Sequence, residues 1–333
     1  MPRSRALVTG LTGFVGSHLA DFLLAETDWE IHGLLRWRSP LDNIEGILRN
    51  ERVHFHYGDL RDSSSLRNCV MAARPDYVFH LAAQSYPRTS FDAPVDTLET
   101  NVNGTARLLE ALKDNARDAR IHICSSSEVY GRVPKAMVPI TEDCRFHPAS
   151  PYAISKVGAD LLGQHYAQAY GMNIQVTRMF THTGPRRGDV FAESSFAKQL
   201  AMIEGRQIDP IIRHGNLESL RTIADVRDAV RAYYLLLTKD PVAGSVYNIG
   251  GAHTCKVGDI LRDIVQRSDH VYRIFFEPDP ARMRPLDADL QVPDCSKFKE
   301  HTGWEPTISY QQTIHDLVQY WRERVKVHSH LDR

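Results

Sequence analysis

The sequence predicts an α/β fold with a doubly wound parallel sheet and a smaller C-terminal domain of mixed α/β structure. Over the first third of the 333-residue chain, short apolar runs typical of buried strands alternate with stretches of helical periodicity. Strands that alternate with helices form parallel sheets covered by helices on both faces. Beyond residue 179 the composition shifts to turn-rich loops, short helices and isolated strands, which indicates a second domain.

The elements of the sheet can be placed in order. A first strand at 6–9 ends at Gly10, and residues 14–24 carry apolar side chains at helical spacing. The same patterns predict further elements: strands at 31–35, 53–57, 77–81 and 173–177, helices at 63–73 and 95–112, and a closing amphipathic helix at 310–325. We expect a Rossmann domain in residues 1–179, to which a segment at about 215–250 returns, and a second domain mainly in residues 180–333.

Composition argues against several classes of function. Lys and Arg number 40 against 41 Asp and Glu, so the net charge of -1 predicts no general affinity for nucleic acid or anionic membranes. The five cysteines lack a CxxC pair, and the 16 histidines lack HExxH or comparable spacing and a cluster of carboxylates, so we expect no disulfide framework and no metal. Without a signal peptide or a membrane-spanning run, we expect a cytoplasmic protein.

A glycine-rich turn joins the first strand to the first helix. It contains Gly10, Gly13 and Gly16, with Phe14 and Val15 between the last two glycines. Glycines let the backbone approach a pyrophosphate, and the helix N-terminus offers unpaired N–H groups and the positive end of a dipole. We therefore expect these five residues to bind a dinucleotide.

The end of the second strand bears on which dinucleotide is bound. An NAD site usually places an acid there to accept the ribose 2′-hydroxyl, whereas this chain has Arg36 and Arg38 and no acid. This pattern favours NADP over NAD. Two solvated surface arginines are the alternative, because the register of a loop is not fixed by sequence.

Tyr152 and Lys156 indicate acid–base chemistry. They are four residues apart at the start of a predicted helix, so their side chains share one face. A nearby ammonium favours the phenolate, and we expect it to lower the tyrosine pKa from about 10 toward neutrality. Ser126 and Glu128 follow the apolar run at 121–123, where a further strand would end.

The order of these motifs resembles that of the extended short-chain dehydrogenase/reductase superfamily, also called the NAD-dependent epimerase/dehydratase family, whose members modify nucleotide-activated sugars. The resemblance covers almost the whole chain and includes the GxxGxxG turn, residues 101–105 and residues 150–152. It implies that Ser126 steadies the C4 oxygen of the sugar, that Tyr152 is the base and that Lys156 also holds the nicotinamide ribose. It also implies further cofactor contacts from chain segments that follow the third and fourth strands: Asp59, Leu60, Leu81, Ala82 and Ala83.

Glu128 helps to indicate which class of enzyme within the superfamily this chain resembles. The segment 125–131, Ser-Ser-Ser-Glu-Val-Tyr-Gly, resembles the motif of the GDP-mannose 4,6-dehydratases, with serine in place of their usual threonine. Such an enzyme oxidises C4, and a carboxylate then removes the acidified C5 proton while water leaves from C6. We expect Glu128 to be that carboxylate, with a solvated loop acid as the alternative.

Other functions stay open. Phe14 and Val15 in the glycine turn, and the segment 225–228, are nearer to the GDP-4-keto-6-deoxymannose reductases, and a C4 epimerase would share the same fold. A cofactor-binding regulator is a further alternative, because fold does not fix function.

We expect the substrate to be a nucleotide diphosphate sugar, with GDP as the favoured nucleotide, and several residues are candidates to bind it. Guanidinium groups bind phosphate bidentately, so a diphosphate site uses more than one cation. The candidates are Ser85, Arg187, Lys198, Arg221 and Arg284, of which Arg221 and Arg284 match the family positions best. Thr181 stands where the family usually has asparagine. Related enzymes pair through helices that correspond to 101–112 and 152–170, so we expect a homodimer or homotetramer.

Overall fold

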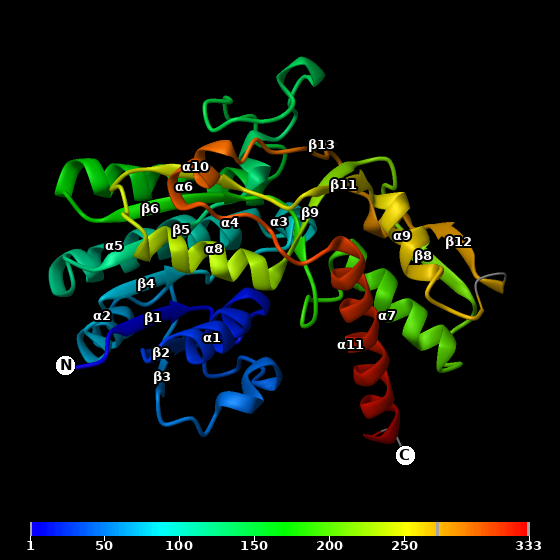
Figure 1. Cartoon of the computed structure of the whole chain (residues 1–333), viewed down its shortest axis with the longest axis horizontal. Coiled ribbons are helices and arrows are strands. Elements are labelled where there is room, and N and C mark those ends of the chain that lie inside the picture. The colour runs from blue at the N-terminus through cyan, green and yellow to red at the C-terminus, as the bar shows by residue number, and fades with distance from the viewer. Residues whose placement is uncertain (1, 271–272, 332–333) are drawn as a thin grey trace.

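The computed structural model describes residues 2–270 and 273–331 and confirms the predicted doubly wound sheet (Figure 1). Seven parallel strands form the main sheet. Their spatial order is β10 (Val246–Ile249), β6 (Ile174–Met179), β5 (Arg120–Cys124), β4 (Tyr77–His80), β1 (Arg5–Thr9), β2 (Glu30–Leu35) and β3 (Val53–Tyr57). The order reverses between β1 and β4, which is the switch point where ligands bind in open α/β sheets.

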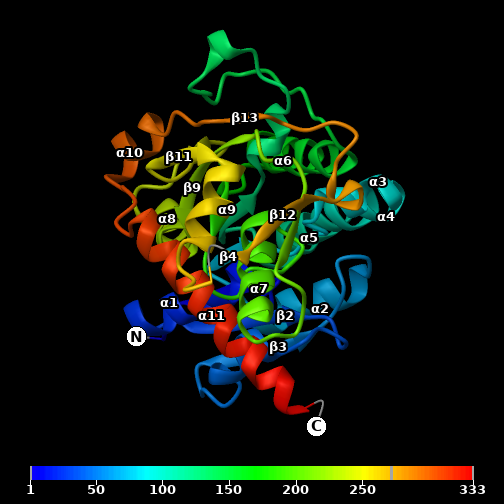
Figure 2. The ribbon, with the colours of Figure 1, turned by 90° about the vertical axis from the view of Figure 1, so that its right-hand side faces the viewer.

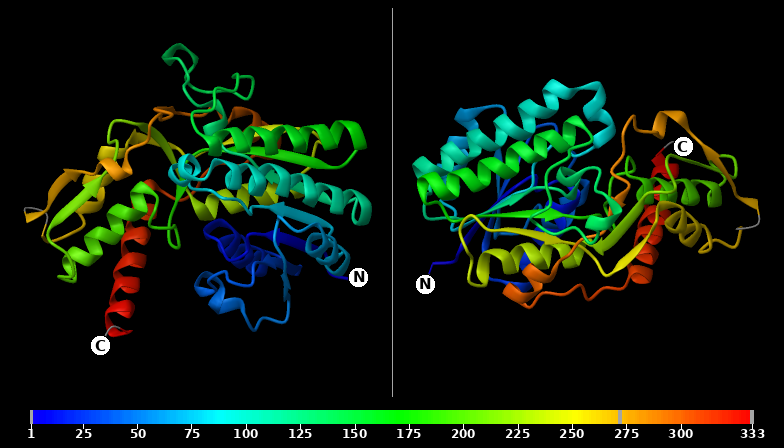
Figure 3. Two further views of the ribbon diagram at one scale, coloured as in Figure 1. Left: turned by 180° about the vertical axis from the view of Figure 1, so that it is seen from behind. Right: turned by 90° about the horizontal axis from the view of Figure 1, so that it is seen from above.

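Helices cover both faces of this sheet because alternate strand residues point to opposite sides. On β1, Ala6 and Val8 pack toward α1 (Phe14–Glu26) and α8 (Val226–Thr238), whereas Leu7 packs into the other core. That second core receives apolar side chains from α2 (Ser63–Ala73), α5 (Gly104–Asn115) and α6 (Pro151–Tyr170). Figure 3 shows the two helical layers from behind and from above.

The helix predicted at 95–112 is divided in the structure. It comprises α4 (Pro94–Leu98), a π-helical turn η2 (Glu99–Asn103) and α5. The π-helical turn carries Asn101, whose side chain donates from Nδ2 to Ser155 Oγ on α6 at 2.9 Å and accepts from the Gln84 N–H at 2.8 Å. This buried bridge fixes α6 relative to the loop after β4.

The C-terminal half builds a smaller unit beside the main sheet, which lies on the right in Figure 1 and faces the viewer in Figure 2. Strand β9 (Leu220–Asp225) pairs with β11 (His253–Lys256), β13 (Leu290–Gln291) and β7 (His182–Thr183), and β8 (Ile211–His214) pairs with β12 (Phe275–Pro278). Its apolar core lies among α7 (Ala192–Glu204), α9 (Val257–Val265) and α11 (Tyr310–Leu331). The remaining short elements are η1 (Asp42–Ile47), α3 (Pro87–Asp92), η3 (Ser127–Tyr130), η4 (Lys135–Met137), η6 (Pro280–Arg282) and α10 (Ser296–Thr302).

On this architecture we propose the domain boundaries expected from the sequence. Strand β10 and helix α8 belong to the main sheet and its cover, which supports the return of the segment at about 215–250 to the domain 1–179. The second domain would span mainly 180–333, of which residues 271–272 and 332–333 lie outside the described residues. Every helix between residues 2 and 331, apart from that gap, is too short or too polar to span a bilayer.

Candidate active site

A cleft of about 640 Å³ opens at the carboxyl ends of the parallel strands. Its lining comes from the loops after β1, β2, β3, β4 and β5, from the first turns of α6, and from segments of the C-terminal half. This volume is in the range typical of sites for small molecules. One continuous cavity thus contains most of the predicted cofactor and sugar residues.

The glycine turn fits a closely approaching anion. Gly10 has φ of +75°, and a Cβ there would lie 2.9 Å from the Ala82 nitrogen. A Cβ on Gly16 would lie 2.2 Å from the Gly10 oxygen, so both positions require glycine. Gly13 caps α1 without a side-chain hydrogen bond, and the first turn of α1 contains no acid. The helix N-terminus thus offers N–H groups and a positive dipole end to the cleft, as a pyrophosphate requires.

The other predicted cofactor residues divide into two groups. The cleft lining includes Arg36, Asp59, Leu60, Leu81, Ala82 and Ala83 together with the five residues of the glycine turn. Arg38 is not part of this lining, and its guanidinium lies 4.3 Å from the ring centroid of Trp37, which is itself exposed. Only one arginine of the predicted pair therefore faces the cleft.

Thr9 organises the loop after β4, a role that sequence reasoning missed. Its Oγ1 accepts hydrogen bonds from the N–H groups of Leu81 and Ala82 at 3.1 and 3.2 Å. The same hydroxyl lies 2.8 Å from His80 Nδ1, and His80 Nε2 lies 2.9 Å from Thr105 Oγ1. This buried chain of polar groups holds the small residues of the loop against the glycine turn.

Ser126, Tyr152 and Lys156 converge on the cleft. Helix α6 begins after Ser150, whose Oγ accepts a hydrogen bond from the Ala153 N–H at 3.0 Å, and this cap sets the direction of Tyr152 and Lys156. Both side chains are buried.

The expected lowering of the Tyr152 pKa is wrong for this structure. Burial raises the pKa of Tyr152 above its ordinary value, and the hydrogen bond from Ser126 and the positive charge of Arg187 offset this rise only in part. Lys156 donates from Nζ to the Cys124 carbonyl at 2.8 Å, and its Nζ lies 6.0 Å from the Tyr152 ring centroid. Burial also lowers the pKa of Lys156. The i, i+4 spacing predicts a shared helical face but not the burial that decides the pKa.

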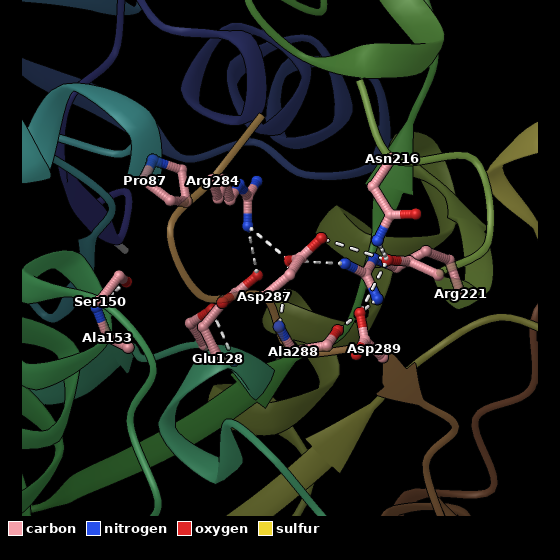
Figure 4. A network of polar contacts seen from close by, with 12 residues as sticks. Pro87, Glu128, Ser150, Ala153, Asn216, Arg221, Arg284, Asp287, Ala288 and Asp289 are labelled. Atoms are coloured by element: carbon pink, nitrogen blue, oxygen red, sulfur yellow. Dashed lines mark hydrogen bonds and ion pairs between the residues drawn. The ribbon is translucent and has the colours of Figure 1, made fainter. Parts of the chain in front are cut away.

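Glu128 lies in the same cleft and belongs to a network of charges (Figure 4). Its Oε1 is 3.4 Å from Arg284 Nη1, and that nitrogen is also 3.2 Å from Asp287 Oδ1. Arg221 approaches the same Asp287 oxygen with Nη2 at 3.3 Å and donates from Nη1 to the Ala288 carbonyl at 2.6 Å. The chain thus brings together an acid after β5 and two arginines of the C-terminal half.

Comparison with known proteins identifies the family. The family model described as GDP-mannose 4,6 dehydratase matches residues 7–317. The chain belongs to the GDP-mannose 4,6-dehydratase family. The chain is 35% identical over 334 residues to GDP-mannose 4,6 dehydratase 1 of Arabidopsis thaliana, which covers 95% of this chain and 89% of the relative.

Solved structures share the fold along nearly the whole chain. RMD from Pseudomonas aeruginosa complexed with NADPH matches with a TM-score of 0.81 and 30% identity, over 96% of this chain and 100% of that chain. DesIV, a dTDP-glucose 4,6-dehydratase from Streptomyces venezuelae with NAD and TYD bound, matches with a TM-score of 0.84 and 28% identity, over 97% and 98% of the two chains. A nicotinamide cofactor is thus typical of these neighbours, and both forms of it occur.

Of the residues predicted to bind substrate in this member of the GDP-mannose 4,6-dehydratase family, four line the cleft and one does not: Lys198. Ser85 and Arg187 line the cleft, as do Arg221 and Arg284. Arg187 is held by Glu193, 3.4 Å from its Nε, and by the face of Phe191, whose centroid is 3.5 Å from its guanidinium carbon. Lys198 does not line the cleft, and its Nζ donates to Asp189 Oδ2 at 2.6 Å.

Two features of the structure, one in the cleft and one outside it, could not be anticipated from single motifs. Asp287 lies between the two arginines, and its only sequence signal is an acid three residues after Arg284. The expectation that no carboxylate clusters with histidine is wrong, because Glu30, His32 and His54 place one ligand atom each within 4.8 Å of one another. Strands β2 and β3 pair in parallel, which brings together residues that are far apart in the sequence.

Proposed function

We propose that this protein is an NADP-dependent nucleotide-sugar 4,6-dehydratase, a lyase that converts GDP-mannose to GDP-4-keto-6-deoxymannose. The observation that carries the proposal is the position of Glu128, a carboxylate in the same cleft as the hydroxyl groups of Ser126 and Tyr152. Family membership supports the substrate. Hydride transfer needs only the two hydroxyl groups, whereas elimination of water needs a further acid–base group beside them.

Ser126, Tyr152 and Lys156 would act on C4 of the sugar. The glycine turn, Leu81 to Ala83 and Lys156 would hold a nicotinamide cofactor, which when bound accepts the C4 hydride and later returns it to C6. Ser126 would donate a hydrogen bond to the C4 oxygen, and Tyr152 would take the C4 hydroxyl proton. It would do so as the phenolate: burial raises the pKa of Tyr152, so the phenolate is a minor form at neutral pH, and the cation of Arg187 favours it.

Glu128 would carry out the elimination. The ketone at C4 makes the C5 proton acidic, so the carboxylate can take this proton while the C6 hydroxyl leaves as water with a proton from the site. When C6 becomes reduced, C5 regains a proton. The sum of the steps is loss of one water from the sugar with no net oxidation or reduction, so the cofactor is regenerated in each cycle.

The preference for NADP rests on the end of β2. No acid follows this strand, and Arg36 lines the cleft, where a guanidinium suits a 2′-phosphate. NAD is the less favoured alternative, which is supported by a solved neighbour that has NAD bound. Comparing the dissociation constants of the two cofactors would decide between them.

We also propose a cytoplasmic homodimer or homotetramer that forms through α4, α5 and α6. Val95 on α4 is 77% exposed, and Ile154 and Leu161 on α6 are each 50% exposed, although all three are apolar. Exposed apolar side chains on neighbouring helices are typical of an interface. The five cysteines are free thiols, which suits a reducing compartment.

The decisive experiment is incubation of the purified protein with GDP-mannose and a catalytic amount of NADP, followed by analysis of the sugar. Formation of a 4-keto-6-deoxy sugar without accumulation of NADPH supports the dehydratase. Consumption of NADPH only after addition of that keto sugar would identify a reductase instead. An isomerised sugar that keeps its 6-hydroxyl would identify a C4 epimerase, and cofactor binding without any turnover would favour a regulator.

A further inference from the structure

Asp287 is placed where two arginines would hold an anion. Its Oδ1 lies 3.3 Å from Arg221 Nη2 and 3.2 Å from Arg284 Nη1, and it also accepts the Ala288 N–H at 3.0 Å. Its Oδ2 accepts from Ser219 Oγ at 3.1 Å. Burial opposes ionisation, but the attraction of Arg221 and Arg284 outweighs it and lowers the pKa of Asp287. The carboxylate is therefore charged at neutral pH.

Arg284 is shared between this carboxylate and the proposed base. The same Nη1 that faces Asp287 lies 3.4 Å from Glu128 Oε1, and Figure 4 shows dashed lines from this arginine to both acids. Both contacts are longer than a strong charge-assisted hydrogen bond, which is about 2.7–2.9 Å. The guanidinium is thus divided between two carboxylates and fully engaged by neither.

We propose that Asp287 acts as an internal anion at the position that the substrate diphosphate takes between Arg221 and Arg284, and that diphosphate binding draws Arg284 away from Glu128. Oε1 of Glu128 is then free to take the C5 proton. The base becomes available only when a nucleotide sugar is bound. This inference rests on the proposed function, because it requires the cleft to bind a nucleotide diphosphate.

The charges of the network give the inference a measurable consequence. Two arginines balance Asp287 and Glu128, so an incoming diphosphate must compete with both carboxylates and is repelled by them. Removing either negative charge should tighten diphosphate binding. A charged carboxylate donates no hydrogen bond to phosphate, so its removal costs the ligand no contact. A residue that merely supported the fold would weaken binding when replaced.

The test is calorimetric titration of the protein with GDP. We expect Asp287→Asn to lower the dissociation constant roughly tenfold, because a like charge is removed beside the phosphates. Asp289→Asn is the matched control, since Asp289 accepts from the same Ser219 at 3.2 Å, is exposed and has no arginine contact among the described residues. Guanosine should bind equally to all three proteins, which restricts the effect to the phosphates.

Glu128→Gln tests the link to the base. Its loss of charge should tighten GDP binding about threefold, whereas Tyr152→Phe removes a catalytic hydroxyl without a charge and should leave the GDP affinity unchanged. If GDP binds the unmodified protein but neither Asp287→Asn nor Glu128→Gln tightens it, the shared arginine has no such role. Absence of GDP binding would overturn the proposed function as well, whereas tightening without dehydratase turnover would preserve this inference alone.

A second observation concerns the outer edge of the main sheet, away from the cleft. Glu30 and His32 on β2 and His54 on β3 offer ligand atoms that all lie within 4.8 Å of one another, and His32 is paired with His54 in the register of the strands. None of the three residues lines the cleft. Two imidazoles and a carboxylate form a donor set that zinc and related divalent metals accept.

His32 is arranged as a metal ligand would be. It is 7% exposed, and its Nε2 is buried with no hydrogen-bond partner among the described residues. Its Nδ1 lies 2.9 Å from His56 Nε2, so a proton on Nδ1 would be donated to His56 and leave a lone pair on Nε2. Metal-bound histidines usually have such a second hydrogen bond.

We infer that Glu30, His32 and His54 bind one divalent transition metal ion, with water in the fourth position. Ligand atoms around tetrahedral zinc are about 3.3 Å apart at bond lengths of roughly 2.0 Å. The ligand atoms, now within 4.8 Å of one another, therefore need to close by up to about 1.5 Å, and Glu30 must exchange its contact with Arg5, 3.4 Å away, for the metal. Lying outside the cleft, the metal would stabilise the sheet edge instead of taking part in catalysis.

Titration with zinc tests this site. The unmodified protein should bind one more zinc ion than His54→Gln, and zinc should raise its melting temperature more than that of the variant. His54 is exposed, so the substitution should not prevent folding, and the equally exposed His315 on α11 provides the control variant His315→Gln. Equal zinc stoichiometry and equal thermal shift in the unmodified protein and His54→Gln would overturn the inference.

Discussion

The buried ion pair between Arg178 and Asp160 leads to the most direct prediction for stability. Arg178 lies on β6 and donates from Nε to Asp160 Oδ2 at 2.9 Å and from Nη2 to Oδ1 at 3.3 Å. Asp160 is fully buried one turn beyond Lys156 on α6. Nη1 of the same arginine donates to the Glu142 carbonyl at 2.8 Å and to Tyr130 Oη at 3.1 Å, which ties the pair to the helical turn that carries Glu128.

Asp160→Asn would keep the shape of the side chain but leave the guanidinium without a counter-ion. Breaking a buried pair in this way costs about 3–5 kcal/mol. Of a total stability of about 5–15 kcal/mol, this is a large share. At about 2–4 °C for each kcal/mol, the melting temperature should fall by roughly 6–20 °C.

Urea denaturation followed by circular dichroism measures the change in the free energy of unfolding. Asp118→Asn, at an exposed position, is the control. We also expect kcat to fall in Asp160→Asn, because Tyr130 and Glu128 share one 3-10 turn. A loss of less than about 1 kcal/mol, the range of an exposed ion pair, would refute the reasoning. Unchanged kcat in a destabilised variant would show that the pair supports the fold without positioning the turn.

Four further predictions concern chemistry and assembly. Glu128→Gln should lower the rate of 4-keto-6-deoxy sugar formation by about 10²–10⁴-fold, a range typical for loss of a general acid or base, while the NADP dissociation constant stays unchanged. Arg36→Ala should weaken NADP binding at least about tenfold with little effect on NAD binding. Arg38→Ala should change the affinity for neither cofactor, since Arg38 stacks on exposed Trp37. Equal losses of affinity for both cofactors in Arg36→Ala would contradict the role of Arg36. Because burial raises the pKa of Tyr152, its base form grows as pH rises, so kcat/KM should increase by up to about tenfold per pH unit above neutrality and Tyr152→Phe should abolish activity; a flat profile would argue against a protonated resting phenol. Leu161→Glu, at a half-exposed position on α6, should convert the oligomer to monomers in sedimentation analysis, and an unchanged mass would place the interface elsewhere.

The sheet could be predicted because its signals are local. Each strand of the first half is a short apolar run, and Gly10 and Gly16 mark a turn whose backbone excludes a Cβ. The division of the helix at 95–112 could not be predicted, since the π-helical turn depends on Asn101 bonding to Ser155, more than fifty residues along the chain. Local periodicity describes which face is buried but not which buried polar groups meet.

The charged residues show the same limit in the site itself. The sequence offers four cations as candidate phosphate ligands, and the carboxylates that they contact in the folded chain separate them. Lys198 is held outside the cleft by Asp189, nine residues away, and Arg187 is held inside it by Glu193. Arg221 and Arg284 instead share Asp287, so two positive charges converge on one carboxylate. Two guanidinium groups that converge on one point are what a site for a diphosphate needs, and only the folded chain shows where they meet.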